Sequence, residues 1–129
     1  MRGYLLDTNV ALIALLRSRT LPVAVREAAF GGPNFLSVIS YWEVLVKSMK
    51  GKLDIGHPRT WWHETLEDLA ATPLHLRPEH VAEGYGLPPI HNDPFDRMLI
   101  AQAIVEDLDM VTTDGHIPRY ASARFRVIS

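Results

Sequence analysis

The sequence predicts a single α/β domain built on a doubly wound, mostly parallel sheet of four or five strands. Two observations predict this fold. Short apolar runs alternate with helical segments along the chain, and no repeat, low-complexity tract or linker interrupts them. The chain has 129 residues, 47% of them hydrophobic, which suffices for one core and is too few for two. We therefore expect one α/β/α sandwich domain over residues 1–129.

The first half of the chain is expected to contain two strands and three helices. In chain order they are a strand over 3–7, helices over 10–18 and 22–30, a strand over 34–37 and a helix over 38–51. Thr8 or Asn9 would cap the first helix, since small polar side chains accept hydrogen bonds from the free N–H groups of a first turn. Glycines follow the second helix and end the third, as is common where helices stop.

The second half of the chain continues the alternation. Its expected elements are a helix over 59–71, a strand over 73–76, a helix over 78–86, a loop over 87–93, a helix over 94–108, and strands over 109–114 and 124–128. Prolines open the helices at 78 and 94, where their fixed φ and missing N–H suit the first helical position.

Composition excludes several classes of protein. The chain has no cysteine, so any bound metal must be held by oxygen or imidazole, and its six histidines show no metal-binding spacing. A net charge of -2 does not fit a protein that coats nucleic acid by bulk electrostatics, so such contacts require a local patch. No apolar run approaches the roughly 20 residues of a membrane span, and no signal-type stretch is present. We expect a cytoplasmic protein without a membrane partner.

Acidic residues gather at the functional edge of the predicted sheet. In open α/β sheets, ligands bind outside the carboxyl ends of the strands, toward which helix N-termini also point. Asp7 and Asp114 each end an expected strand, and Asp93 and Asp96 stand at the start of an expected helix. Three separate elements therefore deliver acids to one edge.

The two acids of "HNDPFD" are expected to have different roles. With proline at the first helical position, Asp93 becomes the N-cap and Asp96 the third residue, an acidic variant of a capping box. At about 100° per residue, Leu99 and Ile100 flank Asp96 around the helix axis, so Asp96 faces inward. A buried carboxylate must be protonated, paired with a cation or bound to a metal, which favours a functional role for Asp96. The alternative is that Asp96 serves only in the capping box.

Glu43 is a fourth candidate, at the boundary of the buried face of the 38–51 helix. Its spacing from Lys47 also fits an ordinary ion pair between residues four apart on a helix. The helical wheel does not decide between these roles.

Four stretches, "LLDTNV", "SYWEVLVKSMKGKLDI", "LPPIHNDPFDRMLIAQA" and "MVTTDGHI", together resemble the PIN-domain ribonucleases, specifically the VapC-type toxins of bacterial toxin–antitoxin pairs. The four stretches occur in the same order as in the family and span nearly the whole chain. A short piece such as "DTN" alone would not support the resemblance. The resemblance assigns the family's acidic quartet to Asp7, Glu43, Asp96 and Asp114. It places supporting polar residues at Asn9 and Thr112, and a subgroup's loop motif at His91 and Asp93.

The resemblance implies an endoribonuclease that depends on Mg²⁺ or Mn²⁺. Asp7, Asp96 and Asp114 would be metal ligands, and Glu43 a further ligand or the group that positions water. Clustered carboxylates suit such hard ions, and without metal their mutual repulsion should raise some of their pKa values. The resemblance also implies an RNA substrate, a cognate antitoxin protein and a homodimer. Ile117-Pro118 depart from the family's frequent aromatic residue after the last acid, so the loop there should differ in shape.

Basic and aromatic residues near the acids are candidates for RNA contacts. Arg97, Lys47 and Lys50 are predicted to bind phosphates, although a solvated surface explains each lysine equally well. Aromatic residues at helical spacing more often belong to a core or an interface. Because Trp61 and Trp62 cannot both face the core from one helix, we expect one of them in a contact surface.

Two other functions compete with a nuclease. An aspartate-based phosphatase typically needs a second acid two residues after Asp7, where this chain has Asn9. A catalytically inactive PIN-like or receiver-like module would bind RNA or protein, but a degenerate site would be expected and all four acids are present.

Overall fold

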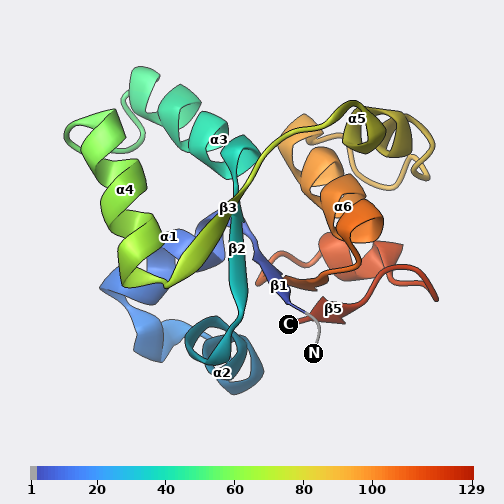
Figure 1. Cartoon of the computed structure of the whole chain (residues 1–129), viewed down its shortest axis with the longest axis horizontal. Coiled ribbons are helices and arrows are strands. Elements are labelled where there is room, and N and C mark those ends of the chain that lie inside the picture. Colours follow the sequence, from blue (N-terminus) through green and yellow to red (C-terminus); the bar gives the residue numbers. More distant parts are fainter. Residues whose placement is uncertain (1–2) are drawn as a thin grey trace.

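Within residues 3–129, which the computed structural model describes, five strands form one parallel sheet in the order β3-β2-β1-β4-β5 (Figure 1). The strands are β1 (Tyr4–Leu6), β2 (Asn34–Ser37), β3 (Ala71–Leu74), β4 (Asp109–Val111) and β5 (Val127–Ile128). Every neighbouring pair is parallel, so the predicted α/β fold is confirmed.

The helices cover both faces of the sheet. They are α1 (Thr8–Leu16), α2 (Val23–Gly31), α3 (Val38–Met49), α4 (Pro58–Asp68), α5 (Pro78–Tyr85) and α6 (Pro94–Glu106), with short 3-10 helices η1 (Ser18–Thr20) and η2 (Ile117–Tyr120). One core lies beneath α1, α2 and α4, and the other beneath α6 and η2 (Figure 1). Side chains alternate between the two faces along a strand, so consecutive residues of one strand belong to different cores. Leu6 and Val111 lie in the first core, and Leu5 and Met110 lie in the second.

The third strand lies two residues earlier than the sequence predicts. Ala70 adopts a positive φ of 48°, which ends the helical stretch before residue 71, and Ala71–Leu74 then pairs with Asn34–Ser37. The buried Asn34 amide donates to the Leu69 carbonyl at 3.2 Å and so anchors this turn. β3 is an edge strand, where Pro73 is tolerated despite its missing N–H.

The junction between β1 and α1 also differs from expectation. Asp7 is the N-cap of α1, and its side chain accepts a hydrogen bond from the Thr8 N–H. The predicted caps, Thr8 and Asn9, instead lie in the first helical turn. The helix therefore begins directly at the end of the strand, and Asp7 serves both elements.

No helix in the described part of the chain is both long and apolar enough to cross a membrane.

Candidate functional site

The acids predicted to form the site come from four elements that meet at the carboxyl edge of the sheet. Asp7 follows β1, and Asp114 lies beyond the adjacent parallel strand β4. Glu43 lies on α3, and Asp96 in the first turn of α6. Asp7, Glu43 and Asp96 are buried, with exposed fractions of 3%, 7% and 7%, and Asp114 is half-buried. Burial of three acids requires compensation of their charge or a proton.

Asp7 is held by two threonines. Its Oδ1 accepts the Thr8 N–H at 2.8 Å, and its Oδ2 accepts the Thr112 hydroxyl at 2.7 Å. Thr112 Oγ1 also accepts the Asp114 N–H at 2.9 Å, so one hydroxyl connects the ends of β1 and β4. Burial, with smaller contributions from the charges of Glu43 and Asp114, raises the pKa of Asp7 to about 6 despite these hydrogen bonds.

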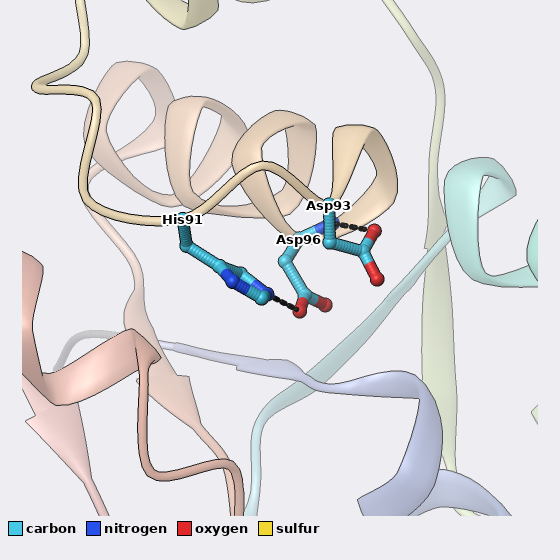
Figure 2. Close-up of side chains that lie close together, drawn as sticks. All are labelled: His91, Asp93 and Asp96. Carbon is cyan, nitrogen blue, oxygen red and sulfur yellow. Dashed lines mark hydrogen bonds and ion pairs between the residues drawn. The ribbon is translucent and has the colours of Figure 1, made fainter.

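Asp93 and Asp96 divide their roles as the sequence predicts. Asp93 is the N-cap of α6, and its Oδ1 accepts the N–H groups of Phe95 and Asp96 at 2.9 and 3.2 Å. Asp96 points inward, and its Oδ2 lies 3.0 Å from His91 Nε2 (Figure 2). The pKa of Asp96 is raised to about 7, mainly by burial and secondly by repulsion from Asp7 and Asp93. The hydrogen bond with His91 acts in the opposite direction and lowers this pKa.

Glu43 contacts Lys47 on its own helix and Thr8 on α1, and its role at a metal stays a prediction. Its Oε2 lies 3.0 Å from Lys47 Nζ, so the ion pair four residues apart on the helix is formed. Its Oε1 accepts the Thr8 hydroxyl at 2.7 Å, and that hydroxyl also lies 2.9 Å from Ser40 Oγ. Thr8 therefore contacts Asp7 through its N–H and Glu43 through its hydroxyl. Sequence reasoning missed this bridge, although the position of Thr8 within "DTN" was a signal for it.

The acids of this set are chemically suited to a hard divalent cation, but within residues 3–129 only Asp96 of the predicted ligands belongs to a group of three or more possible ligand atoms that lie close together. Burial is the main cause of the raised pKa values of Asp7 and Asp96, and repulsion from neighbouring carboxylates adds to both. Carboxylate oxygens are the ligands that Mg²⁺ and Mn²⁺ prefer. Within residues 3–129, His91, Asp93 and Asp96 each offer a ligand atom, and these atoms all lie within 4.8 Å of one another. His91, which sequence reasoning did not assign to a metal, thus lies among the possible donors.

The residues predicted to support the acids or to bind the substrate differ in what they contact and in how exposed they are. Thr112 contacts Asp7 directly, whereas Asn9 is exposed on α1. Lys47 is paired with Glu43, and Lys50 is exposed at the end of α3. The Arg97 guanidinium turns toward backbone carbonyls of the loop before α6, including that of Pro88 at 2.9 Å.

The paired tryptophans both pack on one residue. The Tyr41 ring stacks on Trp62 with ring centroids 4.6 Å apart, and Trp61 lies against the same ring at 6.1 Å. Both tryptophans are half-buried between α3 and α4. Trp42 is more exposed, at 58%, and meets the edge of Phe95 near the start of α6. The expectation that one member of the pair lies in a contact surface stays a prediction.

Comparisons with known proteins complete this description. The sequence matches the PIN domain family over residues 4–123. The fold is similar to that in the crystal structure of VapBC2 from Rickettsia felis bound to a DNA fragment from its promoter, with a TM-score of 0.65, 15% identity and 98% coverage of each chain. It is also similar to FitAcB from Neisseria gonorrhoeae, with a TM-score of 0.63, 23% identity and coverage of 98% of this chain and 96% of that one. No curated protein matches the sequence significantly.

Proposed function

Because the chain belongs to the PIN domain family, whose members are generally nucleases, we propose that it is a metal-dependent endoribonuclease and the toxin of a toxin–antitoxin pair of the VapC type. The observation that carries this proposal is the set of three buried acids, Asp7, Glu43 and Asp96, beside the half-buried Asp114. They lie at the carboxyl edge of the sheet, where α/β proteins bind their ligands.

The proposed cofactor is Mg²⁺ or Mn²⁺. Asp7, Asp96 and Asp114 would hold the ion, with Glu43 as a further ligand or as the residue that positions the attacking water. Such an ion would lower the pKa of water and neutralise negative charge on a phosphodiester. The raised pKa values of Asp7 and Asp96 support this proposal, because a divalent cation would relieve the repulsion that contributes to them.

The chain's own side chains would orient the acids and hold the RNA. Thr112 fixes one oxygen of Asp7, and the cap at Asp93 fixes the first turn of α6, from which Asp96 projects. Lys47 and Lys50 on α3 are proposed phosphate contacts on the Glu43 side of the site. Arg97 is not included, because its terminal N–H groups are engaged by the protein itself.

The test is RNA cleavage by the purified, partner-free chain with Mg²⁺, with Mn²⁺ and with EDTA. Wild type is compared with Asp96→Asn and with Asp68→Asn, a matched change at an exposed acid of α4. We expect metal-dependent cleavage by wild type and Asp68→Asn, and none by Asp96→Asn. Folded wild-type protein that takes up metal yet cleaves no RNA in a diverse pool would refute the nuclease and favour a binding module.

A protein partner and a homodimer complete the proposal. A groove of about 420 Å³ between α1, the 53–55 segment and α4 includes Leu15 and Leu16, which are 39% and 80% exposed. Apolar surface of this kind supports contact with another chain, either an antitoxin or a second copy. Sedimentation of the purified chain at micromolar concentration tests the dimer, and a single monomeric species would refute it.

A further inference from the structure

Arg97 follows the proposed metal ligand Asp96, but its guanidinium is saturated by the protein. Nη1 donates to the Pro88 carbonyl at 2.9 Å and to the Tyr120 hydroxyl at 3.3 Å. Nη2 donates to the carbonyls of Gly84 and Leu87 at 3.0 and 3.1 Å. The His91 carbonyl, 3.5 Å from Nη1, is a fifth and more distant acceptor, so acceptors inside the protein surround the four terminal N–H groups. An arginine in this arrangement has no terminal N–H left to grip a phosphate with its usual fork geometry.

Three of the carbonyl acceptors of Arg97 lie at one structural junction. Gly84 is in the last turn of α5, and Leu87 and Pro88 follow directly after that helix. Carbonyls at a helix C-terminus lack intrahelical partners and carry partial negative charge, so a guanidinium suits them. A Cβ at Gly84 would lie only 3.3 Å from the Met98 side chain, which shows how closely α5 packs on α6. Arg97 thus attaches the start of the 87–93 loop to α6.

Tyr120 attaches the other end of the same loop. This buried residue of η2 accepts the backbone N–H of His91 at 2.8 Å, and its hydroxyl lies 3.3 Å from the His91 carbonyl. Because Arg97 also donates to the Tyr120 hydroxyl, the two side chains form one hydrogen-bonded unit around the backbone of His91.

The position of that backbone determines where the His91 imidazole lies. The ring reaches Asp96 Oδ2 with its Nε2 at 3.0 Å, so the carboxylate and the imidazole orient each other (Figure 2). On its face the ring stacks against His116, with centroids 4.5 Å apart and planes 9° from parallel. A shift of the loop would move the His91 ring relative to both Asp96 and His116, so both contacts depend on where the loop lies.

We infer that Arg97 and Tyr120 are positioning residues: they hold the 87–93 loop so that His91 orients the Asp96 carboxylate, and Arg97 does not serve as a phosphate ligand. The effect of this arrangement on cleavage rests on the proposed nuclease function. The arrangement itself does not, and it is tested without RNA.

The first experiment follows the loop in the metal-free protein by hydrogen exchange and by NMR of the histidine side chains, with His91 assigned through His91→Gln. In Arg97→Lys the charge remains, but the ammonium cannot match four acceptors held by a planar fork. We expect faster exchange over residues 87–93 and shifted His91 and His116 resonances, with β1 and β4 unchanged. Arg26→Lys on α2 is the matched control and should leave the loop as in wild type. An unaltered loop in Arg97→Lys would overturn the inference.

The second experiment separates positioning from phosphate binding by kinetics. Positioning predicts that Arg97→Lys lowers kcat on the order of 10–100-fold while KM and its salt dependence stay near wild type. A phosphate ligand predicts the reverse, namely rescue by lysine and a raised KM in Arg97→Met, and that result would refute the inference. Tyr120→Phe, which removes only the hydroxyl, should repeat the loop and kcat effects and provides the test if Arg97→Lys does not fold. Inactive wild type with a loop that loosens in both variants would count against the nuclease alone.

Discussion

Replacing Asp96 by asparagine should stabilise the metal-free protein at high pH. The folded state raises the pKa of Asp96 from its ordinary 3.8 to about 7, chiefly through burial. Between these values the folded protein binds more protons than the unfolded chain, so stability falls as pH rises. The contribution of this proton is fully present below about pH 4 and is lost by about pH 7. The amide introduced by Asp96→Asn carries no charge, so this variant avoids the loss.

The size of the effect follows from the shift. A difference of one pKa unit between the folded and unfolded states corresponds to about 1.4 kcal/mol. A rise of the Asp96 pKa from 3.8 to about 7 therefore sets an upper limit of about 4 kcal/mol on the folding free energy lost when this proton leaves. Solvent at the partly open site and the shared repulsion with Asp7 reduce the expected gain to about 1–3 kcal/mol at pH 8. For a chain of this size the melting temperature should rise by about 4 °C for each kcal/mol.

Differential scanning calorimetry in EDTA, repeated from pH 4.5 to 8, measures this difference. The gap between Asp96→Asn and wild type should widen steadily with pH, whereas Asp68→Asn, at an exposed position, should stay within about 0.5 kcal/mol of wild type at every pH. A gap that does not change with pH, or an asparagine variant that is less stable at pH 8, would refute the raised pKa of Asp96.

Three other changes test separate parts of the structure. Thr112→Val should lower the free energy of unfolding by about 1–2 kcal/mol, because Asp7 loses a buried hydrogen bond; urea titration measures this, and an equal loss in the exposed control Thr113→Val would contradict it. Adding Mg²⁺ or Mn²⁺ at pH 8 should raise the melting temperature of wild type and leave Asp7→Asn nearly unchanged. Equal shifts in the two proteins would place the cation elsewhere. Tyr41→Leu should destabilise the fold by about 1–3 kcal/mol through loss of the ring stacked on Trp62, and an unchanged midpoint of unfolding, followed by tryptophan fluorescence, would exclude that contribution.

Local patterns in the sequence predict those features of the fold that depend on local physics. Asp93 as the cap and Asp96 as the inward-facing residue follow from proline chemistry and helix periodicity, which involve only near neighbours. The alternation of strands and helices likewise predicts the parallel sheet. The start of β3 was not predicted, because it depends on the positive φ of Ala70 and on a hydrogen bond from Asn34, which is distant in sequence.

The contacts of the candidate site were harder to predict than its acids. Sequence position places Arg97 beside a proposed metal ligand, Asp96, which suggests a phosphate contact, but its guanidinium donates to the Gly84 carbonyl of α5 and to Tyr120. Thr8 reaches Glu43 only because α1 and α3 pack against each other. Such contacts require the three-dimensional arrangement of elements that are far apart in sequence, and periodicity carries no information about it.

The strand order has a consequence for synthesis of the chain on the ribosome. β1 is made first and becomes the central strand, while β2 and β4, which cover its two edges, are made later. Until β4 emerges, one edge of β1 remains open to pairing with other chains, a recognised route to aggregation. The same delay separates Asp7 from Asp114, so the acid cluster is incomplete until the segment after β4 has been made. Assembly of the site therefore cannot precede the synthesis of β4 and of the residues that follow it.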